Sequence, residues 1–571
     1  MPRIRFFNFV VLFVFGVLFL GLANLSIIHG YKYKELSRKN CIRLIPQPGR
    51  RGRILDRHGD VIVDNMISYN LMVLPSEFNN PDQVLSRLSR VTGKDNAALK
   101  RAYRQNFVSL SIPVVVSENI EVKKAIVLEE MKPELSGFTI EPQPLRHYPE
   151  GELGAHVLGY LGEIDRWRLT KLADYGYNTK DIVGFGGAEE QYDYYLRQED
   201  GGLSVEVDRK GRFVRMIGFR PAQGGRDIQL TLDLKIQRIA ESKLADRRGA
   251  VIVMDPFNGE VMAMVSKPSF NPAVFVEKDI AAVQALFNDP KAPLFNRAVS
   301  GAYPAGSLFK LIIASGALEN KKINLSTTFT CDGGLTIGRR RFACWNTHGT
   351  QNLIGAIARS CNVFFFRTGV LLGPQLIHDY AVKLGLSKPT GIDLSSEASG
   401  FIPDPRWDKV YKRKTWYDGD TANFSIGQGE VLVSPAQMAC MIAVFANKGT
   451  LVWPHLIKDV QGRDISATFK KPSLVPIQKS TIETVRKGLR NVVADPEGTS
   501  YLLASLPVEV AGKTGTAQVT GKLPHGWFIG FFPFEKPRYA LCVFLEHGGS
   551  GYAASVVAKE IIADMCSGGV L

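Results

Sequence analysis

The sequence predicts a mixed α/β fold, an α/β sandwich in which a five-stranded, mostly antiparallel sheet has helices on both faces. Apolar residues alternate or run together in short segments bounded by glycine, proline or charged residues, which is typical of strands. The five segments are residues 249–255, 261–265, 508–519, 526–532 and 539–546. The first two are separated by a turn and predict a hairpin. Amphipathic patterns at residues 235–244 and 553–565 indicate helices.

The chain has 571 residues, enough for two or three domains. We predict a stub and membrane anchor over residues 1–30, a mixed α+β module over 31–225 and the α/β unit over 226–571. The middle module combines short strands with amphipathic helices and holds no group of side chains suited to catalysis. We therefore expect the chemistry in the last part of the chain.

Residues 6–28 form an uncharged, mostly apolar run that is long enough to cross a bilayer as one helix. A cleaved signal peptide would have a shorter apolar core, so we predict an uncleaved single-pass anchor. Basic residues lie on both sides of the run, Arg3 and Arg5 before it and Lys32 and Lys34 after it, and a simple count would leave the rest of the chain in the cytoplasm. Large domains cross largely regardless of charge, and we expect this one outside.

The net charge of the chain is +15. Such a balance is compatible with nucleic-acid binding, but the basic residues are spread over the chain without a nucleic-acid-binding motif. We therefore expect no nucleic-acid partner. A positive surface is also suited to work near anionic lipid or an anionic cell-wall polymer, which is the reading we prefer.

A hydroxyl and an amine stand three residues apart at Ser307 and Lys310, just after Pro304 and Gly306. The apolar residues 311–318 predict a helix that begins here, and the two side chains then share one face. Serine acts as a nucleophile when a base lies within hydrogen-bond reach. Lys310 is the candidate base, since burial and neighbouring cations would lower its pKa.

A chain of this length holds roughly one or two Ser-x-x-Lys pairs by chance, so this pair alone is weak evidence for a nucleophile. Two later segments strengthen the prediction. They are Ser360, Cys361 and Asn362, and Lys513, Thr514, Gly515 and Thr516. The second predicts a strand that presents a cation and two hydroxyls, with a glycine that lets a substrate backbone approach. In chain order, Ser-x-x-Lys, Ser-x-Asn and Lys-Thr-Gly resemble the active-site set of penicillin-binding proteins and serine β-lactamases.

Segments before the α/β unit narrow this resemblance. Residues 51–59, 146–160 and 184–192 are similar to the signatures of class B penicillin-binding proteins, and Trp416 and Tyr417 resemble the elongation members more than the septal ones. The resemblance covers essentially the whole chain and implies the penicillin-recognising serine transpeptidase fold. It also implies that residues 31–225 form an elongated pedestal of the dimerisation type that docks partners, although a plain spacer is the alternative.

The resemblance implies acyl transfer during cell-wall elongation. Ser307 would attack the D-Ala-D-Ala carbonyl of a peptidoglycan stem peptide while Lys310 takes its proton. Ser360 would relay a proton to the leaving amine, and Asn362 would hold the substrate amide. An amine of a second stem peptide would then attack the acyl-enzyme, whereas a β-lactam would stall because its ring-opened acyl group cannot leave.

The same resemblance assigns the terminal carboxylate of the substrate to Lys513, Thr514 and Thr516, beside Gly515. It places the oxyanion between the backbone N–H groups of Ser307 and Thr516, an interaction worth about 3 kcal/mol in other enzymes. It implies a bacterial inner-membrane protein with a periplasmic catalytic domain. A membrane glycosyltransferase of the elongation complex and scaffold proteins are the implied partners.

Three other functions remain open. A D,D-carboxypeptidase or β-lactamase would use water as the acceptor and needs a positioned base for deacylation, of which the sequence gives no convincing sign. A membrane-bound β-lactam sensor would share the catalytic set but should have more transmembrane spans. A non-catalytic scaffold of the elongation complex would tolerate loss of the nucleophile, and the intact set of residues argues against it.

Four further residues suggest a metal site, although no cofactor is needed for the expected chemistry. They are Cys331, Cys344, His348 and Cys361, within one window of the sequence. Three thiolates and an imidazole suit tetrahedral zinc, so we favour a structural zinc over a disulfide between Cys331 and Cys344. On a helix, Cys361 would point away from Ser360 and Asn362, and the ion would lie behind the active site.

Overall fold

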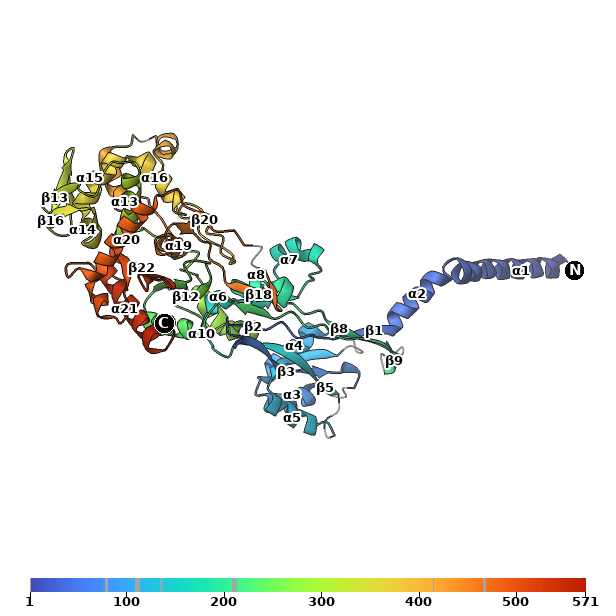
Figure 1. Cartoon of the computed structure of the whole chain (residues 1–571). Helices are drawn as coiled ribbons and strands as arrows, with labels where there is room; N and C mark the ends of the chain where they lie inside the picture. Colours follow the sequence, from blue (N-terminus) through green and yellow to red (C-terminus); the bar gives the residue numbers. More distant parts are fainter. Residues whose placement is uncertain are drawn as a thin grey trace. The chain divides into compact units, whose positions relative to one another are not determined.

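The computed structural model divides into two compact units that interleave along the chain (Figure 1). It describes all residues except 1, 78–80, 108–112, 134, 136, 208–212, 414 and 466–468. Unit 1 comprises Met1–Arg51, Asn65–Leu145 and Arg197–Gly225, and unit 2 comprises Gly52–Asp64, Arg146–Leu196 and Arg226–Leu571. The domain boundaries expected after residues 30 and 225 stay predictions.

Unit 1 begins with an apolar helix. Helix α1 (Pro2–Ala23) continues through a π-helical turn (Asn24–Ile28) and is followed by α2 (Gly30–Cys41). The span Ile4–Ile28 covers 25 residues with a mean hydropathy of 2.6, and none of it is buried by the protein. Its length and composition are sufficient to cross a bilayer, as predicted for residues 6–28.

The rest of unit 1 holds strands of two sheets. In the first, β4 and β5 pair with β3, and leucine, valine and phenylalanine side chains form a core between this sheet and three helices. In the second, β8 lies between β1 and β9. The bounds are β3 (Val61–Val73), β4 (Val114–Ile120), β5 (Phe138–His147), α3 (Pro81–Thr92), α4 (Asn96–Asn106), α5 (Val122–Glu130), β1 (Ile42–Gln47), β8 (Gly201–Val207) and β9 (Phe213–Arg220).

The main sheet of unit 2 has five strands in the order β12-β11-β23-β22-β21, and every pairing is antiparallel. The strands are β11 (Gly249–Met254), β12 (Val261–Lys267), β21 (Ala511–Val519), β22 (Lys522–Phe532) and β23 (Tyr539–Leu545). The five-stranded sheet predicted from the sequence is therefore confirmed. Strand β21 is at the edge, which leaves one of its sides available to another part of unit 2.

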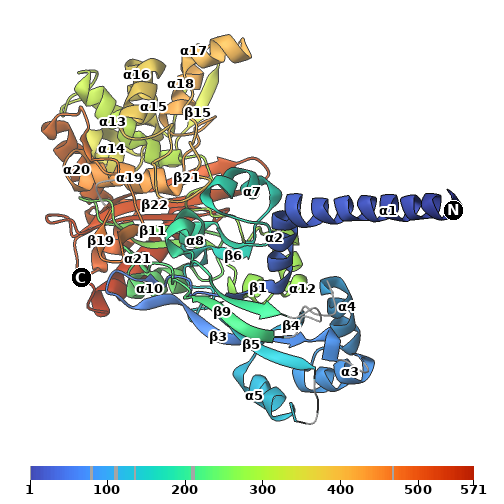
Figure 2. The same cartoon turned by 90° about the vertical axis from the view of Figure 1, so that its right-hand side faces the viewer.

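Both faces of this sheet are covered by helices, because successive residues of a strand point to opposite faces. Val251 and Val253 pack with one pair of helices, while Ile252 and Met254 pack into the larger core on the other side. The first pair is α10 (Leu234–Leu244) and α21 (Gly551–Ser567), and the second face carries α13 (Lys310–Glu319) and α19 (Pro435–Ala446). This two-faced burial is the reason that the strands are apolar at almost every position. Figure 2 shows the layers from the side.

A buried ion pair joins the segments that resemble the class B signatures. Arg146 Nε donates to Glu189 Oε1 at 2.7 Å and Arg146 Nη1 donates to the carbonyl of Gly52 at 2.6 Å, with both charged side chains almost fully buried. A Cβ at Gly52 would lie 1.9 Å from the carbonyl oxygen of Arg226, so the backbones approach as only glycine allows. All three signature segments thus meet within unit 2, the unit that contains the five-stranded sheet.

Candidate active site

Ser307 lies in a 3₁₀ turn, Gly306–Phe309, that leads directly into α13. The predicted helix therefore exists, but the serine precedes its first α-helical residue, Lys310. Eight of the ten residues of α13 are buried. A helix so enclosed holds the turn at its start in one position, which a nucleophile needs.

Two glycines fix the backbone around Ser307. Gly306 has φ +56°, and its N–H donates to the carbonyl of Gly427 at 3.0 Å. A Cβ at Gly306 would lie 2.7 Å from the carbonyl oxygen of Thr516, and one at Gly427 would lie 2.3 Å from the carbonyl oxygen of Gly306. Three chain segments therefore approach one another at the serine more closely than any side chain would allow.

Lys310 is fully buried and surrounded by neutral oxygen atoms. Its Nζ lies 2.7 Å from the carbonyl oxygen of Ser360, 2.7 Å from Asn362 Oδ1 and 3.2 Å from Ser360 Oγ. Burial lowers the pKa of Lys310 to about 8, although the nearby sulfur atoms of Cys344 and Cys361 act in the opposite direction. At pH 7 this pKa leaves roughly a tenth of the amine uncharged, far more than in an ordinary lysine.

Ser360 and Cys361 lie in a turn and not on a helix, so the helical placement expected from the sequence was wrong. Ser360 has φ +54°, and Cys361 is the N-cap of α15 (Asn362–Leu372), with its Sγ 3.5 Å from the N–H of Phe364. The left-handed residue reverses the chain between α14 (Leu353–Ala358) and α15. This turn directs the Ser360 carbonyl and the Asn362 amide to Lys310.

Strand β21 divides the Lys-Thr-Gly segment between its two faces. Thr514 and Thr516 line a cavity, whereas Lys513 is fully buried and does not line it. Burial, together with the charge of Lys310, lowers the pKa of Lys513 well below its usual value. A Cβ at Gly515 would lie 3.0 Å from the Leu308 side chain, so the close approach that this glycine permits is by the Ser307 turn.

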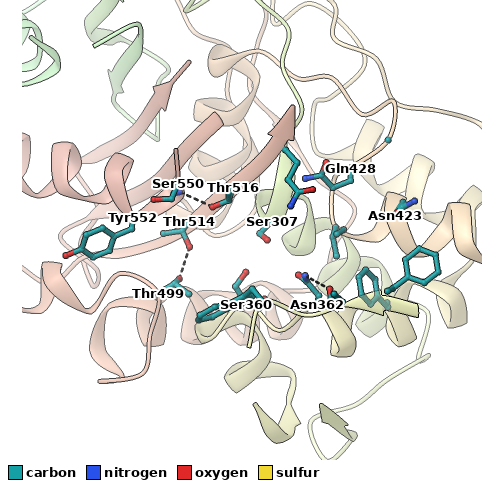
Figure 3. Close-up of a pocket in the computed structure, with 18 of the residues that line it drawn as sticks. Ser307, Ser360, Asn362, Asn423, Gln428, Thr499, Thr514, Thr516, Ser550 and Tyr552 are labelled. Atoms are coloured by element: carbon teal, nitrogen blue, oxygen red, sulfur yellow. Dashed lines mark hydrogen bonds between the residues drawn. The ribbon is translucent and has the colours of Figure 1, made fainter. Parts of the chain in front are cut away.

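The cavity has a volume of about 840 Å³ and holds Ser307 between two walls (Figure 3). On one wall the Thr514 hydroxyl donates to Thr499 Oγ1 at 2.7 Å, and the other wall carries Ser360 and Asn362. Sequence reasoning missed the remaining polar lining residues, because they come from separate strands, helices and loops and share no spacing. These are Arg340, Arg341, Asn423, Gln428, Thr499, Gln518, Ser550 and Tyr552.

The cysteine and histidine residues predicted as metal ligands do come together. One ligand atom from each of Cys331, Cys344, His348 and Cys361 lies within 4.8 Å of the others. His348 Nδ1 is 3.5 Å from the sulfur atoms of both Cys331 and Cys344, which are free thiols and not a disulfide. This donor set has the composition of a structural zinc site, in which four N and S ligands surround the ion.

The cluster contacts the catalytic turn directly. The N–H of Asn362 donates to Cys344 Sγ at 3.2 Å, and Asn362 Nδ2 donates to the carbonyl of Ala343 at 3.3 Å. The Cys361 thiol donates a hydrogen bond to Cys344, which lowers the pKa of Cys344 and raises that of Cys361. One thiolate is therefore favoured even without an ion.

Two family models match the chain, one over its N-terminal module and one over its C-terminal α/β part. The penicillin-binding protein transpeptidase domain matches residues 249–567, and the penicillin-binding protein dimerisation domain matches residues 46–230. A serine and a buried lysine at the start of a helix that packs on such a sheet, with a dimerisation module before them, are features of the class B penicillin-binding proteins. The chain belongs to this family.

Curated relatives and solved structures are similar to nearly the whole chain. Peptidoglycan D,D-transpeptidase MrdA of Escherichia coli strain K12 is 34% identical over 590 aligned positions, which cover 97% of this chain and 92% of the relative. Penicillin-binding protein 2 in a complex with MreC from Helicobacter pylori superposes with a TM-score of 0.81 at 26% identity, over 93% of this chain and 99% of that one. A chain of a peptidoglycan synthase complex that coordinates polymerization and crosslinking superposes with a TM-score of 0.74 at 28% identity, over 98% of this chain and 98% of that one.

Proposed function

We propose that the protein is a peptidoglycan D,D-transpeptidase that uses Ser307 as its nucleophile. The observation that carries this proposal is the environment of Lys310, a fully buried amine whose hydrogen-bond acceptors are neutral oxygen atoms and which forms no ion pair with a carboxylate among the described residues. A neutral amine donates two N–H groups and keeps one lone pair. Because Ser360 O and Asn362 Oδ1 take the two donors, the lone pair is left to accept a hydroxyl proton.

In the proposed reaction Ser307 Oγ attacks the carbonyl of a D-Ala-D-Ala peptide bond, and its proton passes to Lys310. The proton then reaches the leaving amine of the terminal D-Ala through Ser360, whose hydroxyl is 3.2 Å from Lys310 Nζ. The negative oxygen of the tetrahedral intermediate is held by the backbone N–H groups of Ser307 and Thr516. The resulting ester on Ser307 is the acyl-enzyme.

The hydroxyls of Thr514 and Thr516 are assigned to the terminal carboxylate of the donor peptide, because both line the cavity beside Ser307. Lys513 acts from behind the strand. Its buried amine donates to the carbonyl of Thr514 at 3.0 Å, so it orients the strand and, when protonated, contributes positive potential. Asn362 is assigned to the amide of the bound peptide.

Transfer to an amine is favoured over hydrolysis by the composition of the cavity. Among the described residues that line it, none is an aspartate or a glutamate. A carboxylate that could activate water for deacylation is therefore missing from these described walls, and an amine, which is a stronger nucleophile than water, is the favoured acceptor of the acyl group. This observation weighs against the β-lactamase and carboxypeptidase alternatives.

The test is acylation of the purified full chain by a fluorescent penicillin, followed by peptide mapping. We expect one label per chain, on Ser307, and no label on Ser307→Ala. Ser315→Ala is the matched control, because Ser315 lies on the same helix with its hydroxyl bonded to the Leu311 carbonyl. Label on another side chain, or retained labelling of Ser307→Ala, would overturn the proposal. Cross-linking of lipid-linked strands by the wild type then separates transfer from hydrolysis.

We also propose that the chain sits in the bacterial inner membrane by its N-terminal helix, with unit 2 in the periplasm. A membrane glycosyltransferase and a scaffold protein are the proposed partners, supported by likeness to chains solved in a synthase complex and with MreC. Protease treatment of intact spheroplasts tests the topology. Digestion of unit 2 is expected, and protection of it would contradict this orientation.

Zinc bound by Cys331, Cys344, His348 and Cys361 is a further part of this proposal, as a structural ion that the acyl transfer itself does not need. The close approach of three sulfur atoms and one imidazole nitrogen supports it. Elemental analysis of protein purified without added metal should give about one zinc per chain, and Cys331→Ser should lose most of it. Cys440→Ser is the control, since Cys440 is a buried thiol outside the cluster. A metal-free wild type would refute this part.

A further inference from the structure

A short hairpin forms one rim of the active-site cavity and carries two arginine residues that line it. Strand β14 (Gly334–Ile337) pairs with β15 (Arg340–Ala343), with Leu335 opposite Phe342 and Thr336 opposite Arg341. Within the described part of the chain, Arg340 and Arg341 are the only charged side chains that line the cavity. The cavity therefore has a positive rim and no acidic residue to neutralise it.

The hairpin is fixed to the catalytic machinery. Phe342 is buried in a small cluster with Phe366 and Ala422, which anchors β15 to α15 and to α18 (Asp418–Ser425). Just beyond β15, the Trp345 indole N–H donates to the carbonyl of Ser360 at 3.2 Å. The position of the two arginines is therefore set by the same turn that holds Lys310, and not by a loose surface loop.

The two guanidinium groups are available to a ligand. Both side chains are exposed, and neither forms an ion pair within the described residues. Arg341 Nη2 lies 3.5 Å from a backbone carbonyl, that of Asp332, and the Arg340 guanidinium lies 5.3 Å from the centre of the Phe342 ring. A planar guanidinium held in this way is suited to paired hydrogen bonds with a carboxylate.

We propose that Arg340 and Arg341 recognise a carboxylate of the peptide substrate other than its C-terminal one, and so select stem peptides that carry a free acid at that position. This inference rests on the proposed transpeptidase function and deepens it. The C-terminal carboxylate is assigned to the threonines of β21, on the opposite wall from the turn that anchors the hairpin. A second anionic group of the donor, or one of the acceptor, is the chemistry that the arginine rim fits.

The test uses the full chain and two pairs of synthetic peptides. The donor pair consists of D-Ala thioester peptides that differ only in one internal carboxylate, free or as the carboxamide, and acylation of Ser307 is followed. The acceptor pair consists of peptide amines with the same difference, and aminolysis of a preformed acyl-enzyme is followed. We expect the wild type to prefer the free acid by about ten-fold in one of the two assays, which identifies the donor or the acceptor as the source.

The variants give the second half of the test. The double variant Arg340→Gln/Arg341→Gln should lose this preference, chiefly through slower reaction of the free acid. Arg339→Gln is the matched control, since Arg339 lies in the turn of the same hairpin but does not line the cavity. Stoichiometric labelling of Ser307 by a fluorescent penicillin confirms that each variant is folded.

Absence of any preference in the wild type, in both assays, would overturn the inference. Equal slowing of acid and amide by the double variant would also overturn it, because that result indicates a structural role for the hairpin. Failure of the wild type to be labelled at all would instead refute the proposed function.

Discussion

Two buried cations in unit 2 are held in opposite ways. Arg146 faces the carboxylate of Glu189 at 2.7 Å in the core, so its charge is neutralised. Lys310, equally buried, faces a carbonyl, an amide oxygen and a hydroxyl, none of which carries a charge. Desolvation disfavours an ammonium that has no carboxylate beside it, and the pKa of Lys310 therefore falls.

The difference separates stability from function. A buried charge with a matched partner keeps its proton and joins segments that are distant in sequence. A buried amine without one is poised to lose its proton and accept another. Three experiments distinguish these roles, taken from the largest expected effect to the smallest.

Replacement of Lys310 by methionine should lower the rate of Ser307 acylation by a fluorescent penicillin by roughly 10²- to 10⁴-fold, because the general base is lost. The free energy of unfolding should fall by at most about 1–3 kcal/mol, because the desolvated amine leaves the core while the oxygens of Ser360 and Asn362 lose their donor. Stopped-flow labelling and urea denaturation measure the two quantities. A variant that acylates at the wild-type rate would show that Lys310 is not the base.

Replacement of Glu189 by alanine should lower the stability of the fold and leave the acylation rate nearly unchanged. It leaves Arg146 charged and buried without its partner, and we expect the free energy of unfolding to fall by about 3–5 kcal/mol. The control is Glu150→Ala, because Glu150 pairs with Arg238 at the surface and its loss should change stability by at most about 1 kcal/mol. Acylation by the Glu189 variant that remains folded should be nearly normal. Equal stabilities of the two variants would contradict this account.

The pH dependence of acylation should follow Lys310. Its folded pKa is about 8, below the ordinary value of 10.5, so the neutral base accumulates and the rate rises as the pH passes through 8. Between these two values the unfolded chain binds a proton that the folded chain has lost, and the contribution of Lys310 to stability therefore grows with pH across that window. Labelling rates from pH 6 to 10 give the first result. A rate that is flat or falls over this range would exclude a neutral lysine as the base.

Much of this arrangement could be predicted from local sequence. The strands of the main sheet follow from short apolar segments with turn residues between them, and the placement of Ser307 and Lys310 at the start of a buried helix follows from the apolar run after them. The sequence also predicts that Cys331, Cys344, His348 and Cys361 lie close together, because thiolates and imidazole are the usual ligands of a structural zinc ion.

Other features depend on contacts between distant segments. A left-handed φ at Ser360 is not encoded by a serine, and it arises because the turn must bring a carbonyl to Lys310. Lys513 is buried because successive side chains of β21 point to opposite faces, so that Lys513 and Thr514 cannot both face the cavity. Thr499 lies in a loop and the two arginines of the rim lie in β15, and the packing of neighbouring segments sets the positions of all three.

The glycines at 306 and 427 have a consequence for the evolution of drug resistance. Any side chain at either position would collide with backbone atoms around the nucleophile. The backbone that holds Ser307 therefore does not tolerate substitution at these two glycines. Escape from β-lactams is therefore expected to proceed through the walls, where a change at an exposed residue such as Tyr552 does not displace the serine.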